Sequence, residues 1–209
     1  MESGQGRKVR SDKKWSVQPT ISIELRDCIH RLSKITGEHI KDVIEAICVS
    51  GIDNKKVITY LSSNFRQDIR INNTLYIGDS SRASVKKRTA PGQSERVSTR
   101  VSGTMHVSLK ALAYSLDCSA ARACALLVDA TVRDADFINE FVKEFLEKHV
   151  DSEQMRELKK VLKYVKANNP YEEDVSWAAL LSYLIEEVRT GAEKVQDTIT
   201  GFVINNWKQ

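Results

Sequence analysis

Polar and apolar residues alternate one by one between positions 18 and 25. Ile21, Ile23 and Leu25 are apolar, and the residues between them are polar. This period of two is typical of a β-strand that has one face on a core and the other face exposed. We therefore predict a short strand here, with the three apolar side chains turned inward.

From Leu25 to Cys48 the apolar residues are spaced by three and four, which is the spacing of amphipathic helices. Two helices fit this stretch. The turn between them is placed at Thr36 and Gly37, where glycine can end the first helix and threonine can cap the second. The predicted order of elements is strand, helix, turn, helix.

The same order returns when the sequence is shifted by 84 positions, from Ile23 to Val107. Most apolar positions then coincide, although few residues are identical. The shift predicts a second strand at Thr104–Val107. Since neither unit has enough apolar surface for a core of its own, we expect one structural unit that occurs twice and packs on itself.

Further helices are predicted within each unit and after the second one. Asp53 is placed to cap a third helix over residues 53–64, and the β-prone stretch 69–77 is interpreted as a hairpin around Asn72 and Asn73. In the second unit the predicted helices are Leu109–Leu116, Ser119–Val132 and Asp136–Lys148. Capping signals and amphipathic spacing predict more helices beyond residue 151.

The expected fold class is mainly α, with two short antiparallel strands and a small all-α region at the C-terminal end. The expected organisation is a disordered basic arm (1–14), a first module (15–78), a basic flexible linker (79–97), a second module (98–150) and a helical C-terminal region (151–209).

The charge of the 209-residue chain is distributed unevenly. The net charge is only +4, but basic residues gather in residues 1–16 and again between Arg82 and Arg100. Clustered lysine and arginine in segments that flank folded modules favour a polyanion as partner, most often a nucleic acid. A solvated linker that only keeps the chain in solution is the alternative.

Several classes of protein are disfavoured by composition. The amino terminus is polar and no apolar run approaches ~18 residues, so we expect a cytoplasmic protein without a signal peptide or membrane span. The cysteines have neither C-x-x-C spacing nor a histidine at metal-ligand spacing, so buried structural thiols are favoured over a zinc site. They are Cys28, Cys48, Cys118 and Cys124. We expect no cofactor and no small-molecule substrate.

A family resemblance rests on a few residues of the first unit. They are Thr20-Ile21-Ser22-Ile23 in the strand, Gly37 in the turn, and Ile44 and Ala46-Ile47 in the second helix. With these residues, positions 18–50 resemble the ribbon-helix-helix superfamily of Arc-like and MetJ-like DNA-binding proteins. The chain departs from that family in its third helices, and at Ala121, which stands where the second turn glycine belongs.

The resemblance implies a way of binding DNA. In that family two chains pair their strands into an antiparallel ribbon that enters the major groove. Two copies within one chain therefore imply a tandem ribbon-helix-helix pseudo-dimer, which would build the ribbon without a partner chain.

The outward face of the predicted strands supplies the candidate base-reading residues. If the apolar strand residues face the helices, their polar neighbours face outward and can form hydrogen bonds with base edges. These residues are Gln18, Thr20, Ser22, Ser102, Thr104 and His106. A merely solvated face is the alternative, but a two-stranded ribbon with one uncovered face favours a function.

Phosphate contacts are predicted from helix ends and basic segments. The amino end of the second helix of each unit offers free amides and the positive end of the helix dipole. Contacts of this kind position a protein on DNA without specifying sequence. The predicted residues are Lys13, Lys14, Gly37, Lys41, Lys86, Lys87, Arg88 and Arg122.

Two alternatives to the ribbon stay open. Residues 112–127 also fit a helix, a tight turn and a recognition helix, and a tandem helix-turn-helix protein would take its base contacts from that helix, at Ser119, Ala120, Arg122 and Ala123. The other alternative is an interaction scaffold that does not bind DNA. An enzyme is not expected, since the histidines form no cluster and no phosphate loop, nucleophile elbow or paired-acid motif is present.

The sequence thus favours a sequence-specific double-stranded DNA-binding protein of a bacterium or mobile element, associated with the nucleoid. Transcriptional repressor, plasmid partition adaptor and transfer accessory factor all stay open as roles, and an antitoxin fits least. The apolar residues of region 151–209 exceed what a pair of helices can bury, so we also predict self-association through this region.

Overall fold

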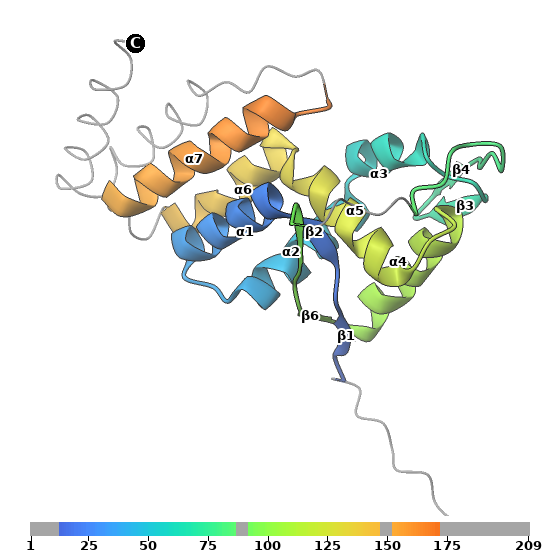
Figure 1. Cartoon of the computed structure of the whole chain (residues 1–209), viewed down its shortest axis with the longest axis horizontal. Coiled ribbons are helices and arrows are strands. Elements are labelled where there is room, and N and C mark those ends of the chain that lie inside the picture. Colours follow the sequence, from blue (N-terminus) through green and yellow to red (C-terminus); the bar gives the residue numbers. More distant parts are fainter. Residues whose placement is uncertain (1–12, 87–91, 147–151, 172–209) are drawn as a thin grey trace, which may run out of the picture.

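The computed structural model describes residues 13–86, 92–146 and 152–171 (Figure 1). Within these ranges the chain is mainly helical and has small antiparallel two-stranded sheets, as predicted. Most of the predicted basic arm and the predicted helices after residue 171 lie outside the described residues.

Two short strands followed by three helices occur twice along the chain. The first part contains β1 (Trp15–Val17), β2 (Thr20–Ser22), α1 (Ile23–Thr36), α2 (Ile40–Asp53) and α3 (Lys55–Ser62), followed by the hairpin strands β3 (Ile69–Ile71) and β4 (Thr74–Tyr76). The second part contains β5 (Ser94–Arg96), β6 (Thr99–Val101), α4 (Gly103–Ser115), α5 (Ala120–Val132), α6 (Ala135–Leu146) and α7 (Ser152–Asn168).

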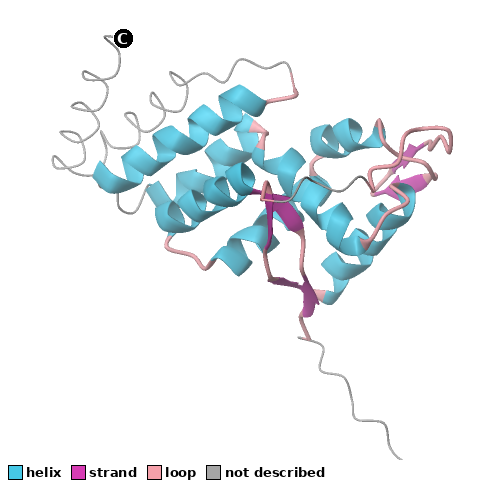
Figure 2. Ribbon diagram, viewed as in Figure 1, coloured by secondary structure: helices cyan, strands magenta, loops and turns pink. Residues whose placement is uncertain are grey.

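Four of the strands build an antiparallel ribbon within the one chain (Figure 2). β1 pairs with β6 and β2 pairs with β5, and both pairs have the same register. Between them the Val97 N–H donates a hydrogen bond to the Pro19 carbonyl at 2.9 Å. Residues 15–22 therefore run antiparallel to residues 94–101, and these two segments are called the ribbon below.

The second strand of the ribbon does not lie at Thr104–Val107, the position predicted from the sequence. Those residues belong to α4, which Ser102 caps by accepting a hydrogen bond from the amide three residues later at 3.2 Å. Ser22 caps α1 in the same way and at the same distance. The two units are therefore related by a shift of 80 residues, from Ser22 to Ser102, and the predicted shift of 84 is wrong.

The error has a simple cause in helical periodicity. An amphipathic helix repeats its apolar face every three or four residues, so an added shift of four leaves apolar residues aligned in the helices and displaces only strands and caps. As a consequence β5 lies inside the predicted linker 79–97, and the second unit begins before residue 98. Ile23, predicted to face inward from a strand, is the first residue of α1 and is 37% exposed.

The shift of 80 also matches the ends of the helices. Gly37 follows α1 with a φ of 72°, and Asp117, 80 residues later, has a φ of 50°. The second turn thus uses Asp117 in the left-handed conformation, and Ala121 does not occupy the position of the turn glycine. His39 and Ser119 are the N-cap residues of α2 and α5.

A polar cluster joins the starts of the third helices. Asn54, and not Asp53 as predicted, caps α3, because its side-chain oxygen accepts from the amides of Lys56 and Val57. Its amide group donates to Asp134, the equivalent residue of the second unit, at 2.8 Å. Asp134 is fully buried and also receives the Lys56 ammonium at 3.0 Å. The cluster thus links the two units through equivalent positions.

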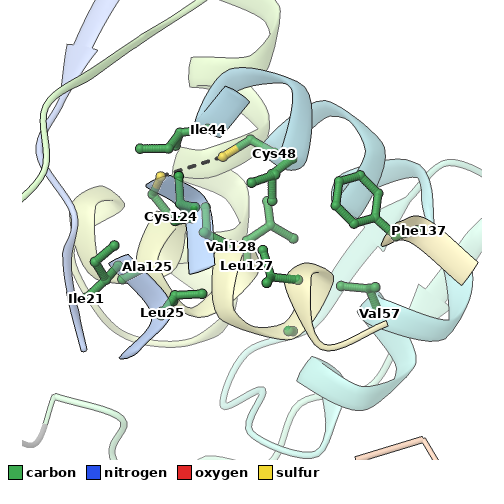
Figure 3. Packing of buried hydrophobic residues seen from close by; sticks show 14 of the residues in the cluster. Ile21, Leu25, Ile44, Cys48, Val57, Cys124, Ala125, Leu127, Val128 and Phe137 are labelled. Carbon is green, nitrogen blue, oxygen red and sulfur yellow. Dashed lines mark hydrogen bonds between the residues drawn. The ribbon is translucent and has the colours of Figure 1, made fainter. Parts of the chain in front are cut away.

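The crossing of α2 and α5 places both units in one core (Figure 3). Cys48 and Cys124 meet there with their sulfurs 3.7 Å apart, both fully buried. The contact with Cys124 and burial raise the pKa of the Cys48 thiol. The helices approach closely at Gly51, where a Cβ atom would lie 2.0 Å from the Thr131 hydroxyl oxygen.

The outer elements differ between the two units (Figure 1). α6 and α7 pack on α1, whereas the β3–β4 hairpin, predicted around Asn72 and Asn73, lies next to α4. On α7, Leu158 and Leu162 are buried against the chain itself, so they are not exposed for the predicted self-association. The remaining apolar residues of that prediction lie outside the described residues: Trp177, Leu181, Leu184, Phe202 and Trp207.

Candidate nucleic-acid interface

The ribbon has one buried face and one exposed polar face. Val17, Ile21 and Val101 are at most 5% exposed and anchor the ribbon to the core. The other face alternates with them and is exposed except at the half-buried Ser94. It consists of Ser16, Gln18, Thr20 and Ser22 on one strand and Ser94, Arg96, Ser98 and Arg100 on the other. The face therefore has polar hydrogen-bonding groups and two positive charges.

Arg96 and Arg100 are the charged side chains of this exposed face. Arg96 lies opposite Thr20 and Arg100 lies opposite Ser16, so one guanidinium lies at one end of the face and the other lies near the opposite end, next to the Ser22–Ser94 pair. Neither guanidinium has an ion-pair or hydrogen-bond partner within the part of the chain that the structure describes. Each guanidinium offers five N–H donors in a planar fork, which remain available to a ligand.

Three of the six predicted base-reading residues lie on the exposed face. Gln18 and Thr20 are exposed near its middle, and Ser22 lies at its end, where the hydroxyl is used to cap α1. The other three were placed on the ribbon by the wrong shift. They lie beyond its end, in the cap and first turn of α4, and are Ser102, Thr104 and His106.

Arg96, Ser98 and Arg100 were not predicted as base-reading residues, because the second strand was predicted at Thr104–Val107 and the residues up to 97 were predicted as a linker. The signal was present in the sequence. Valine or threonine occupies every second position from residue 97 to residue 101, with arginine and serine between them. This is the period of two that identified the first strand.

An aromatic stack stands at one end of the ribbon. Trp15 stacks on His106 with 4.7 Å between ring centroids and 3° between ring planes. The Lys13 ammonium lies 5.1 Å from the centroid of the Trp15 ring, a cation–π contact. Trp15 remains 43% exposed, so this end presents an aromatic ring and a positive charge to the surroundings.

The equivalent end of the ribbon, related by the shift of 80, is built from charged residues. Arg26 stands in the place of His106, and Glu95 stands in the place of Trp15. These two form an ion pair, and Arg26 also binds Asp27 at 2.6 Å. Two carboxylates thus surround one guanidinium, so the ends of the ribbon differ in charge.

The predicted phosphate-binding residues have unequal surroundings. Three are engaged within the chain, Lys14 by Glu45 at 2.5 Å, Lys86 by Asp117 at 3.0 Å and Arg122 by the Val85 carbonyl at 3.0 Å. Gly37 is exposed in the turn that follows α1, Lys41 is exposed in the first turn of α2, and Lys13 lies over Trp15. Lys87 and Arg88 lie outside the described residues.

The amino ends of α2 and α5 differ in their caps. His39 gives α2 no side-chain cap, whereas the Ser119 hydroxyl accepts from the Arg122 amide in α5. The Thr99 hydroxyl donates to the Lys41 carbonyl at 2.7 Å, which fixes the start of α2 beside the ribbon. The uncapped first turn of α2 is therefore the better of the two for a phosphate next to the ribbon.

Metal sites and deep pockets are not a feature of the described residues. These residues contain no group of three or more His, Cys, Asp or Glu side chains that could hold a metal ion. Shallow pockets of about 280 and 290 Å³ lie between α1 and α7 and between α2 and α6. Cys28 is buried like Cys48 and Cys124, as predicted, and burial raises its pKa to about 12, whereas Cys118 is half-buried.

Comparison of the chain with protein-family models, curated proteins and solved structures found no match. Among the described helices, none is by itself long and apolar enough to cross a membrane, and α4 with α5 meets that criterion only as a pair bent by 95°.

Proposed function

We propose that this chain is a sequence-specific double-stranded DNA-binding protein that places its ribbon in the major groove. The observation that carries the proposal is the exposed ribbon face, on which the guanidinium groups of Arg96 and Arg100 have no partner in the described residues. The major groove is about 12 Å wide and admits a two-stranded ribbon. Arginine bound to guanine O6 and N7 is the commonest specific contact there.

The proposal includes a tandem ribbon-helix-helix architecture within one chain. It is supported by the matched caps at Ser22 and Ser102, the matched turns at Gly37 and Asp117, and the contribution of one strand by each unit to a single ribbon. In such an architecture one chain supplies both strands, and no partner chain is required to complete the DNA-binding surface.

Phosphate contacts on either side of the ribbon would hold it in the groove. The uncapped start of α2 lies beside the ribbon and carries the exposed Lys41. Lys13 lies at the end of the ribbon that carries Trp15. Neutralising phosphates releases counterions, so log K should fall by about 0.9 per contact for each tenfold rise in salt.

A helix-turn-helix mode has less support than the ribbon. Its recognition helix would be α5, in which eight of thirteen residues are buried. A helix that fills the core offers few side chains to base edges. Arg122, the most promising of them, is engaged with the Val85 carbonyl.

The biological roles that fit this mode are transcriptional repressor, plasmid partition adaptor and accessory factor of DNA transfer. Each would act in the cytoplasm on the nucleoid or a mobile element, and none requires catalysis. Self-association through residues 151–209 stays a prediction.

The test is selection from a pool of duplexes with a randomised central segment, followed by fluorescence anisotropy on the selected duplex. The double variant Arg96→Ala with Arg100→Ala should lose about 2–6 kcal/mol of binding free energy on that duplex, and much less on random DNA. Arg70→Ala is the matched control, because Arg70 is an exposed arginine on β3 of the β3–β4 hairpin, outside the ribbon.

The alternatives predict other outcomes of the same experiment. Selection of no duplex would favour the scaffold. Loss of sequence preference in Arg122→Ala, with the ribbon variants unchanged, would favour the helix-turn-helix mode.

A further inference from the structure

We propose that the ribbon reads an asymmetric DNA element in a single orientation, with Arg96 and Arg100 on guanines of the same DNA strand. This inference rests on the proposed DNA-binding function and deepens it. Its basis is the difference between equivalent positions of the two units.

Equivalent positions of the exposed face carry different residues. The shift of 80 relates Ser16 to Arg96 and Thr20 to Arg100. In a dimer of identical chains these positions would be identical, and the ribbon would match a palindrome. Here both guanidinium groups belong to the β5–β6 strand, and the β1–β2 strand has hydroxyl groups at the corresponding positions. The face therefore has no two-fold symmetry of chemistry.

The spacing of the arginines defines the predicted element. Arg96 and Arg100 are four residues apart on one face of one strand, which corresponds to about 13 Å at 3.3 Å per residue. With about 3.4 Å per base along a DNA strand, and a somewhat longer path along the groove, this span covers about three to four base pairs. A ribbon lying along the groove has each of its strands nearer to one DNA strand. Two guanines of one DNA strand, three or four steps apart, therefore suit the two arginines.

The ends of the ribbon add a second, independent asymmetry. The Trp15 end has the Lys13 ammonium over an exposed indole, which favours a neighbouring phosphate. At the opposite end Glu95 and Asp27 outnumber Arg26, and carboxylates repel phosphates. Turning the protein around on the same element would exchange these ends, so one orientation is favoured.

The decisive experiment exchanges the arginines between equivalent positions. The swap variant S16R/T20R/R96S/R100T keeps the net charge and moves both guanidinium groups to the β1–β2 strand. Because the two strands are related by an approximate two-fold axis, this variant should bind the element selected by the wild-type chain, within about tenfold of its affinity. In that complex the protein should lie on the element in the orientation opposite to that of the wild-type chain.

Orientation is measured with a thiol-reactive iron–EDTA reagent that cleaves nearby DNA. Cys118 is half-buried while the other three cysteines are buried, so it is the site of labelling, and its equivalent in the first unit is the exposed Glu38. Labelled at Cys118, the wild-type chain should cut to one side of the element and the swap variant to the other. Moving the label in the E38C/C118S variant should also move the wild-type cut to the other side.

Several results would overturn the inference while leaving DNA binding intact. They are a palindromic selected element, wild-type cleavage on both sides, and a swap variant that cuts on the wild-type side. Absence of binding by the wild-type chain would instead overturn the proposed function.

A second measurement uses only the wild-type chain and does not depend on the folding of the swap variant. 7-Deazaguanine lacks the N7 acceptor, so placing it at either contacted guanine should weaken binding roughly tenfold. The two sensitive guanines should lie on one DNA strand. Sensitive guanines on opposite strands would contradict the inference.

Discussion

The two halves of this chain share their framework and differ in what they expose. Their caps, turns and third-helix starts coincide at a shift of 80, and α2 and α5 cross in a common core. Their outer elements and ribbon residues do not match. α7 covers α1 whereas a hairpin lies by α4, and arginines occupy only one strand of the ribbon. The duplicated framework thus supports a surface that is not duplicated.

This contrast shows that packing constrains the residues of the shared core more than those of the surface. A shared core fixes equivalent positions in both halves, because each apolar residue must fit its neighbours at close packing. A surface residue that packs against no neighbour can differ between the two units. A protein that binds DNA in one orientation can therefore have a nearly symmetric core.

The largest predicted effect concerns the closest approach of the halves. Gly51→Thr should cost about 3 kcal/mol or more of the free energy of unfolding, because the new side chain would overlap Thr131. Urea denaturation measures this loss. Adding Thr131→Gly exchanges the two equivalent residues and should recover at least half of it. Additive losses in the double variant would show that the two positions do not face each other.

A loss no larger than that of Gly51→Thr is expected in the polar cluster between the third helices. Asp134→Ala should cost about 3 kcal/mol, because Asp134 is fully buried and binds Lys56 and Asn54. Asn54→Ala, at the equivalent position, should cost about 1 kcal/mol through loss of the α3 cap. Denaturation in urea compares the two.

The control for this pair is Asp136→Ala. Asp136 also contacts the Lys56 ammonium, at 3.3 Å, but is 71% exposed, so its loss should cost under about 0.5 kcal/mol. Equal costs for Asp134→Ala and Asp136→Ala would contradict the role assigned to burial.

The outer helix α7 brings an acid-sensitive carboxyl group, that of Glu157, against α1 in the first half. Hydrogen bonds from Lys160 and Arg31 lower the pKa of the Glu157 carboxyl to about 2, from an ordinary value of 4.5. A lowered pKa stabilises the fold above the unfolded value, and that stability is lost as the pH falls from about 4.5 towards about 2. The melting temperature of the chain should fall over this window.

Glu157→Gln should lower the melting temperature at neutral pH and flatten the profile in the same acid window. Glu153→Gln is the control, since Glu153 is exposed and reaches Arg156 only at 3.8 Å. An unchanged acid profile in Glu157→Gln would mean that Glu157 does not carry this sensitivity.

The smallest predicted effect distinguishes the ends of the ribbon. Trp15→Ala should weaken DNA binding by about 0.5–1 kcal/mol, because it removes the stack on His106 and the position of Lys13. Arg26→Ala at the equivalent end should cause no larger loss. Fluorescence anisotropy on the selected duplex measures both, and a clearly larger loss in Arg26→Ala would reverse the assignment of the ends.

Much of the framework could be predicted from the sequence, because helical spacing and capping residues are local signals. The first strand, the paired helices and the hairpin all follow from such signals. The shift between units could not be fixed by apolar residues alone, since a helix looks similar after one turn. The cap at Ser102 and the alternation before it would have fixed the shift.

The candidate site was predicted in part. Gln18 and Thr20 were predicted because their strand was placed correctly, whereas Arg96 and Arg100 were not predicted because the second strand was expected at Thr104–Val107. The stack of Trp15 on His106 joins residues far apart in the sequence. Such a contact follows only from the ribbon register, which no local pattern encodes.

The central claim is that DNA covers the exposed face of the ribbon, and thiol protection tests it most directly. Ser98→Cys places a thiol at the centre of that face, and Asn73→Cys places one at the exposed tip of the β3–β4 hairpin. Alkylation rates of both variants, in a Cys118→Ser background, are measured with and without the selected duplex. We expect DNA to slow the alkylation of Cys at position 98 strongly and to leave position 73 unaffected. Full reactivity at position 98 on a chain saturated with DNA would contradict the account.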